Sequence, residues 1–144
     1  MQLHPYLFFE GRCEEAIGFY RQALGAEVQL LLRYRESPDP GVCPRGGEEK
    51  VMHASLRIGA STVLVSDGRC SRRRHFHGFA VSLTAPTDAE AERCFMALAE
   101  RGTVQVALTP TFFATRFGMV EDRFGVLWMV SVPKPEFDQG QGGG

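Results

Sequence analysis

Nine residues from Arg69 to His77, RCSRRRHFH, are the densest group of reactive side chains in the sequence. They include four arginines, two of the four histidines and one of the four cysteines. Side chains of these types serve in nucleic-acid patches, metal sites, catalytic loops and charged connections between structural elements. The elements on either side of the run decide between these four roles.

The balance of charge argues against a nucleic acid or an anionic membrane as the main partner. The chain has 144 residues, with 17 acidic and 16 basic side chains and a formal net charge of −1. Both partners attract proteins with a clear basic excess. No apolar run approaches the roughly 20 residues that a membrane span needs, and the first residues do not resemble a signal peptide. We therefore expect a cytoplasmic protein that binds neither nucleic acid nor membrane.

The cysteines show no spacing typical of a metal or redox motif. Cys13, Cys43, Cys70 and Cys94 are scattered, with no C-x-x-C pair, so neither a zinc knuckle nor a dithiol is predicted. We expect reduced thiols. The sequence also lacks a G-x-S-x-G elbow and a phosphate-cradling glycine loop, so no motif predicts a nucleophile.

The first half of the chain reads as strand, helix, strand, loop and hairpin. Residues 3–9 are apolar and aromatic and fit a buried strand. A helical spacing of apolar residues ends at Leu24, and Gly25 follows as a helix C-terminal glycine. A further strand, a loop rich in Pro and Gly, and a predicted hairpin complete this half, over residues 26–34, 35–50, 51–58 and 61–66.

The second half repeats this order. Residues 79–84 alternate as a strand does, and Thr87-Asp-Ala-Glu90 has the form of a capping box at the start of a helix. Gly102 closes the helix, and strands follow at 103–108, 114–122 and 126–132. The chain is therefore predicted to be an α+β protein of two tandem βαβββ modules. We place the modules at residues 1–68 and 78–133, with the charged run at 69–77 as their connection and 134–144 as a disordered tail within one structural domain.

Three stretches carry a resemblance to a known family. They are PYLFFEGRCEEAIGFYRQALGAEV, VMHASLRIG followed by VLVSD, and RFGMVEDRFGVLWMV. Together they resemble the PhnB-like branch of the vicinal oxygen chelate superfamily, which includes glyoxalase I, bleomycin- and fosfomycin-resistance proteins and extradiol dioxygenases. The resemblance implies a curled mixed sheet around a shared cleft, a homodimer and a small-molecule ligand.

The resemblance also implies a divalent metal, which would be held by residues on the first and last strands of each module. In this sequence the four ligand positions fall on Pro5, on or next to Leu64, on Gly78 and on Met129. None of these is a usable ligand for a hard metal ion. We therefore expect no resident cofactor, with a divalent metal as the alternative.

Two histidines stand beside empty ligand positions. His4 precedes Pro5 and His77 precedes Gly78. A one-residue shift turns a strand side chain to the opposite face, so these imidazoles serve as ligands only if the strand register is shifted, for example by a bulge. In the unshifted register we expect His4, Tyr6 and Phe8 to pack on the helix.

His53 is the main candidate for chemistry. In VMHASLRI the apolar residues at 52, 54, 56 and 58 share one face, so His53, Ser55 and Arg57 point to the other face, toward the expected cleft. An imidazole there serves as a general base, a hydrogen-bonding group or a ligand; the alternative is a buried histidine satisfied by a neighbour.

Further candidates come from strand ends and from an aromatic cluster. Glu121 is a second candidate catalytic residue. Asp67 either lines the cleft or anchors a turn. Phe113 and Phe117 fit the wall of an apolar pocket, although core packing also explains them. With Met129, these residues and the three of the 51–58 strand form the predicted ligand-binding cleft.

Two functions remain open. The first is a small-molecule binding protein that lacks the usual metal site. The second is an enzyme of the lyase, isomerase or dioxygenase kind that uses His53 or a displaced metal on a small oxygenated substrate. We interpret RCSRRRHFH as the connection between modules, whose arginines attract an anionic ligand or pair with the acidic loop GGEEK at 46–50.

Overall fold

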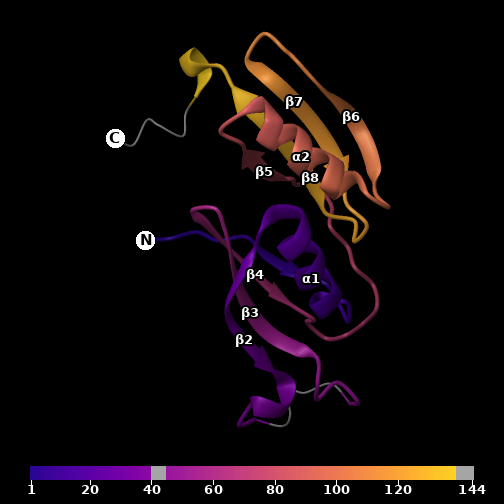
Figure 1. The fold of residues 1–144 in the computed structure, drawn as a ribbon. Helices are drawn as coiled ribbons and strands as arrows, with labels where there is room; N and C mark the ends of the chain where they lie inside the picture. The colour runs from indigo at the N-terminus through magenta and orange to yellow at the C-terminus, as the bar shows by residue number, and fades with distance from the viewer. Residues whose placement is uncertain (40–44, 139–144) are drawn as a thin grey trace. The chain divides into compact units, whose positions relative to one another are not determined.

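The computed structural model describes residues 1–39 and 45–138. The chain divides into two compact units, Met1–His75 and Phe76–Gly144, and the division falls within the predicted connection. Each unit is a four-stranded mixed sheet with one helix, in the order βαβββ (Figure 1). The α+β class and the tandem modules predicted from the sequence are thereby confirmed.

The first unit has the strand order β1-β4-β3-β2, in which β1 is parallel to β4 and the other pairs are antiparallel. A single 3-10 turn, Tyr34–Glu36, follows the second strand. The bounds of the elements are β1 Tyr6–Phe8, α1 Cys13–Leu24, β2 Glu27–Arg33, β3 Val51–Ile58 and β4 Ser61–Ser66.

Helix α1 ends as the sequence predicts. Gly25 has φ +67° and its N–H donates to the carbonyl of Arg21, so the backbone turns out of the helix in the left-handed conformation that glycine adopts at low cost. Glu14 and Glu15 lie in the first turn, where their charge favours the positive end of the helix dipole. The buried face of the helix comprises Cys13, Ala16, Ile17, Phe19, Tyr20, Ala23 and Leu24.

The second unit repeats the topology, with the order β5-β8-β7-β6 and β5 parallel to β8. A 3-10 turn at Pro135–Phe137 follows the last strand, and the Phe137 ring lies 6.1 Å from that of Phe112. The predicted disordered tail falls partly on residues 139–144, which lie outside the described residues. The bounds are β5 Val81–Thr84, α2 Asp88–Ala99, β6 Thr103–Thr109, β7 Ala114–Glu121 and β8 Leu127–Pro133.

Helix α2 begins at a capping residue, and two glycines allow close contacts between this helix region and the sheet. The Thr87 side chain accepts a hydrogen bond from the N–H of Glu90 at 3.1 Å, as expected of the N-cap residue. At Gly102, a Cβ would lie 2.3 Å from the carbonyl oxygen of Glu121, so only glycine lets the chain leaving the helix approach β7 this closely. Gly118 makes the same allowance for the Phe95 ring, which would be 2.8 Å from an added Cβ.

The expected register of the first strand is wrong. Leu7 and Phe9 are the buried residues, at 2% and 0% exposure, and the Phe9 ring lies 6.1 Å from that of Tyr20 on α1. Tyr6 and Phe8 point to the other face of the sheet. Residues 6 to 9 are all apolar or aromatic, so no alternation in the sequence distinguishes the two faces.

The first residues of the connection donate backbone N–H groups to the side chain and the carbonyl of Glu10. Glu10 Oε2 accepts the N–H groups of Arg69 and Ser71 at 3.1 Å each, and the carbonyl of Glu10 accepts the N–H of Arg72. Residues 69–72 are thereby fixed to the first unit. Among the helices that the structure describes, none is long and apolar enough to cross a membrane.

Candidate functional site

Strand β3 separates apolar from polar residues on its two faces, as predicted. Ala54 and Leu56 are fully buried on the face that carries α1. His53, Ser55 and Arg57 alternate with them and therefore lie on the opposite face, which we call the helix-distal face. The three predicted site residues of this strand are thus brought together on one surface.

Tyr6 and His53 form the central contact of this face. Tyr6 Oη lies 2.7 Å from His53 Nδ1, which links β1 to β3. Burial raises the pKa of the Tyr6 phenol, although a hydrogen bond with Ser66 opposes this shift. A protonated phenol that donates to Nδ1 leaves the proton of a neutral imidazole on Nε2. The pair therefore offers a hydrogen-bonding imidazole nitrogen beside an aromatic surface.

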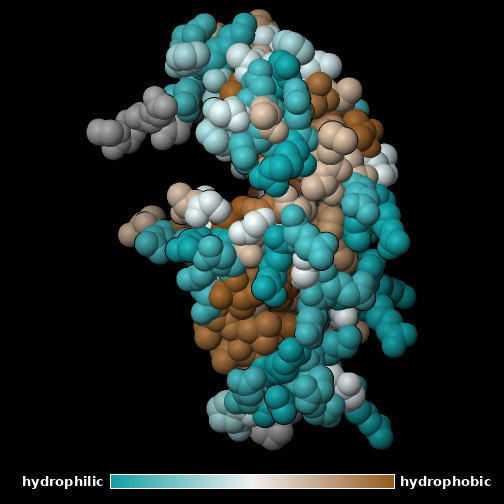
Figure 2. All heavy atoms as spheres, in the orientation of Figure 1, coloured by the Kyte–Doolittle hydropathy of each residue, from teal (hydrophilic) through white to brown (hydrophobic). Residues whose placement is uncertain are grey.

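Apolar side chains surround this polar pair. The Phe8 ring stacks on that of Tyr6 with centroids 5.0 Å apart. Leu64 pairs with Tyr6 across β1 and β4 and with Ser55 across β4 and β3, and Leu30 pairs with Ser55, so both leucines share the helix-distal face. Figure 2 shows a hydrophobic patch over β2 and β3. The exposed large apolar residues of this face include Tyr6, Phe8 and Leu30.

Arg57 has a more peripheral position near the end of β3. It forms an ion pair with Glu27 of β2, and both side chains are more than half exposed. An exposed pair of this kind contributes about 0–1 kcal/mol to stability. Arg57 therefore supplies a charge at the margin of the Tyr6 and His53 surface.

The second sheet has a helix-distal face of its own. Phe117, Met129 and Glu121 lie on it, because Phe117 pairs with Ser131, Met129 with Met119 and Glu121 with Leu127. The Phe113 and Phe117 rings meet edge to face at an interplanar angle of 73°, with centroids 5.3 Å apart. Glu121 Oε2 accepts a hydrogen bond from Gln105 Nε2 at 3.3 Å. The predicted site residues of this unit are thus also gathered on one face.

Asp67 does not lie with His53. It is 1% exposed, and its Oδ1 accepts the N–H groups of Gly11 and Cys13 while Oδ2 accepts that of Val51, all at 2.8 Å. The carboxylate therefore joins the start of α1 to the start of β3. This geometry fits the anchoring role that the sequence left open, and it leaves the side chain on the helix side of the sheet.

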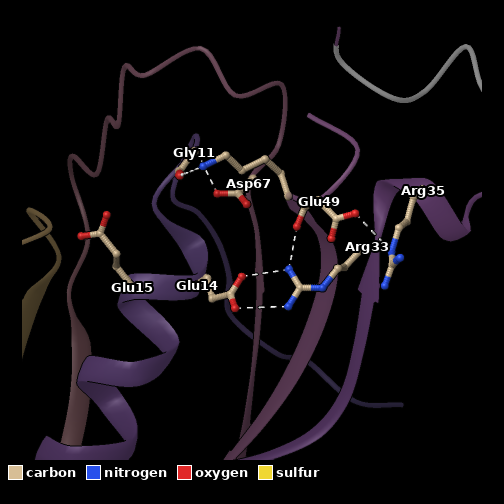
Figure 3. A pocket seen from close by; sticks show the side chains of 8 residues that line it. Gly11, Glu14, Glu15, Arg33, Arg35, Glu49 and Asp67 are labelled. Carbon is tan, nitrogen blue, oxygen red and sulfur yellow. Dashed lines mark hydrogen bonds and ion pairs between the residues drawn. The ribbon is translucent and has the colours of Figure 1, made fainter. Parts of the chain in front are cut away.

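A pocket of about 520 Å³ opens beside Asp67 at the start of α1 (Figure 3). Arg33 donates from Nη1 and Nη2 to the two carboxylate oxygens of Glu14, at 2.8 and 3.2 Å, and these bonds hold the pKa of Glu14 below its usual value. Arg35 pairs with Glu49 at 3.5 Å, and Lys50 Nζ donates to the carbonyl of Gly11 at 2.9 Å. The charges that line this pocket largely satisfy one another.

Comparison with known proteins supports one family. Residues 2–130 match the model of the Glyoxalase/Bleomycin resistance protein/Dioxygenase superfamily. The chain belongs to that superfamily. It is 36% identical to Protein YjdN of Escherichia coli strain K12, over 94% of this chain and 98% of that protein.

Two solved structures of this superfamily's fold are similar over most of the chain. Protein PA1353 from Pseudomonas aeruginosa is 42% identical, with a TM-score of 0.82, over 92% of this chain and 98% of that one. A putative 3-demethylubiquinone-9 3-methyltransferase, PhnB protein, from Bacillus cereus is 27% identical, with a TM-score of 0.71, over 92% and 99% of the two chains. These similarities confirm the PhnB-like resemblance seen in the sequence.

Two of the residues at the expected metal positions of the superfamily do not fit a metal. Leu64 and Met129 lie on the helix-distal faces of β4 and β8 and offer no ligand for a hard divalent ion. Within residues 1–39 and 45–138, no three His, Cys, Asp or Glu side chains are grouped so that they could hold an ion. The metal-free prediction rests on this choice of side chains.

The two histidines considered for a shifted register lie outside regular strands. His4 precedes β1, and its Nε2 lies 3.4 Å from Gln2 Oε1. If the alternation of the strand continued back from Tyr6, His4 would lie on the helix-distal face. The sequence predicts Pro5 on that face instead. His77 is exposed in the connection before β5.

Sequence reasoning did not identify Tyr6 as the partner of His53. The pairing depends on the register of β1 against β4, where Tyr6 lies opposite Leu64, and on that of β4 against β3, where Leu64 lies opposite Ser55. The sequence did contain a signal for this contact: Tyr6 is the one aromatic residue of the first strand that carries a hydroxyl group. A partly buried tyrosine hydroxyl needs a polar partner.

Proposed function

We propose that this protein binds a small, largely apolar molecule on the helix-distal face of its first sheet, without the metal typical of its superfamily. The position of Leu64 carries the proposal. It lies at or next to an expected ligand position, and it stands between Tyr6 and Ser55 in the register of the sheet. This place supports contact with an apolar ligand.

The Tyr6 and His53 pair gives the surface a polar anchor. Binding sites for small molecules combine apolar walls with a few placed polar groups that fix the orientation of the ligand. An oxygen atom on an otherwise apolar ligand would hydrogen-bond to His53, and a ring of the ligand would contact Phe8 or Leu64.

Superfamily membership further supports a homodimer, which light scattering of the purified protein would measure.

Fluorescence of 1-anilinonaphthalene-8-sulfonate, and its displacement by aromatic alcohols and carboxylates, tests the binding surface. We expect Leu64→Asp to abolish saturable binding of the probe. Val104→Asp is the matched control, because Val104 is an exposed apolar strand residue of the second unit, paired with the helix-side residue Val120. Equal loss in both variants, or binding unchanged in Leu64→Asp, would contradict the proposal.

Metal analysis of the purified protein tests whether it lacks the metal typical of its superfamily. We expect substoichiometric Ni, Zn, Mn and Fe in the wild-type protein and in His53→Ala. A stoichiometric metal that is lost on His53→Ala would overturn the metal-free reading.

The Tyr6 and His53 hydrogen bond also favours a second candidate, an enzyme of the lyase or isomerase kind. A neutral imidazole oriented by a phenol is suited to general acid–base catalysis, which contributes about 10²–10⁴-fold to a rate. Turnover of a small oxygenated substrate that is lost in His53→Ala and only reduced in Tyr6→Phe would support this candidate. Ligand-induced stabilisation without turnover would support the binding protein.

A further inference from the structure

A second, smaller pocket in the first unit is lined mainly by cations. Its volume is about 260 Å³. Four cationic side chains and one carboxylate give its lining a net charge of +3 at neutral pH, and Cys70 adds a thiol. The side chains are Glu10, Arg12, Lys50, Cys70, Arg72 and Arg74. The pocket thus uses two arginines of the run RCSRRRHFH that the proposed function does not use.

Two acidic groups, Glu10 and Glu15, offset only part of the positive charge of this pocket. Glu10 Oε2 accepts two backbone N–H groups, from Arg69 and Ser71. Glu15 pairs with Arg12 at 2.8 Å, and the Arg12 hydrogen bond, followed by the charges of Arg12, Arg74 and Lys50, holds the pKa of Glu15 below its usual value. The positive field of the pocket therefore reaches a carboxylate outside its lining.

Arg74 lacks an acceptor that its position calls for. Its Nε is buried, and no hydrogen-bond partner reaches it among the residues the structure describes. A buried guanidinium N–H without an acceptor is costly, so this group calls for an oxygen from water or from a bound anion. Lys50 Nζ donates to the Gly11 carbonyl, and its charge is shared with Glu14 and Glu15, which lie beside the pocket.

The part of the loop that ends at Arg72 is held in place before any ligand arrives. Besides the Glu10 contacts, the N–H of Cys70 donates to the carbonyl of Asp67 at 2.9 Å, and Tyr34 Oη donates to the carbonyl of Gly68. Gly68 has φ +58°, a left-handed conformation that glycine adopts at low cost. A fixed loop lowers the entropy that binding must overcome.

We propose that this pocket binds a dianionic phosphate group, as inorganic phosphate or as a small phosphate monoester. Arginine guanidinium groups bind phosphate oxygens with paired, charge-assisted hydrogen bonds, and a lysine adds a point charge. The volume lies below the roughly 300–1,000 Å³ of pockets for drug-sized ligands, which favours a small ligand. The pocket is formed by residues other than those of the Tyr6 and His53 surface, so it is independent of the proposed function.

Titration calorimetry with sodium phosphate, at constant ionic strength adjusted with sodium chloride, tests the proposal. We expect saturable binding of one phosphate per chain, and Arg72→Gln and Arg74→Gln each to weaken it by about ten-fold or more. Arg69→Gln and Arg73→Gln are matched controls, because they remove the same charge from the same loop but do not line the pocket. They should change affinity less than about two-fold in salt that screens distant charges.

A second measurement distinguishes phosphate bound in the pocket from nonspecific attraction of anions to the basic loop. It does not depend on the arginine variants. Bound phosphate should slow the alkylation of Cys70 by iodoacetamide, measured by peptide mapping, whereas sodium chloride of equal ionic strength should not. Both measurements are repeated with glycerol phosphate. The compound that binds with the higher affinity, inorganic phosphate or the monoester, is then the better representative of the ligand. Absence of saturable binding by the wild-type protein, or equal weakening by all four substitutions in folded variants, would overturn the proposal.

Discussion

Tyr6 Oη and His53 Nδ1 lie 2.7 Å apart, which joins the first strand of the chain to a residue 47 positions later in the sequence. The contact combines the candidate catalytic or binding histidine with a phenol whose pKa burial raises above its ordinary value. Protonation of the phenol in the folded state makes the stability of the protein depend on pH in the alkaline range.

We expect the free energy of unfolding to fall as the pH rises above about 10, the ordinary pKa of tyrosine. The unfolded chain loses the phenolic proton first, so stability that is fully present below that value decreases as the pH rises toward the higher folded-state pKa of Tyr6. Tyr34, whose pKa burial also raises, contributes in the same direction. Urea titrations between pH 8 and 11 measure this slope, and Tyr6→Phe should make it less steep. An unchanged slope in Tyr6→Phe would contradict a raised pKa at this residue.

Asp67→Asn should destabilise the protein strongly. The carboxylate accepts three backbone N–H groups, and an asparagine in its place turns an NH₂ group toward at least one of these donors. Each buried donor left without an acceptor costs about 1–3 kcal/mol. Glu14→Gln is the matched control, because Glu14 is an exposed partner of Arg33 and its change should cost less than about 1 kcal/mol. Equal effects of the two substitutions in urea unfolding would refute the anchoring role of Asp67.

The second unit has a comparable buried carboxylate, for which the only tryptophan in the sequence gives a direct probe. Asp122 Oδ2 accepts a hydrogen bond from Trp128 Nε1 at 2.9 Å, while Oδ1 accepts the N–H groups of Phe124 and Val126. We expect Asp122→Asn to shift the emission maximum of Trp128 and to lower the free energy of unfolding by about 1–3 kcal/mol. Glu100→Gln, at an exposed carboxylate, should leave the emission unchanged. A native emission spectrum in Asp122→Asn would show that the indole contact is not maintained in solution.

Local patterns were sufficient to predict most elements of the fold. The predicted hairpin strands at 51–58 and 61–66 agree with the observed β3 and β4. Gly25 and Thr87 were also assigned correctly to helix ends. These features depend on residues close together in the sequence, where alternation, glycine conformation and capping act directly.

The parts that were missed depend on contacts between distant residues. The face of β1 could not be read from YLFF, because all four residues favour burial. Asp67 was ambiguous because its partners Gly11 and Cys13 lie 56 and 54 positions away. The cationic pocket likewise combines residues near 12, 50 and 72, so a run of arginines showed the charge but could not show which of them share a pocket.

Two glycines should respond in opposite ways to the same substitution. Gly102→Ala places a methyl group 2.3 Å from the backbone carbonyl of Glu121, a contact that only a backbone shift relieves. We expect a loss of about 1–3 kcal/mol in the free energy of unfolding.

Gly18 lies exposed in α1 with no atom within 4 Å of an added Cβ. Gly18→Ala should therefore stabilise the protein by about 0.5–1 kcal/mol, because alanine loses less backbone entropy in a helix. Urea unfolding of both variants, followed by circular dichroism, measures the two effects. A neutral Gly102→Ala would contradict this close packing of the chain after α2 against β7, since the 2.3 Å approach leaves no space for the methyl group.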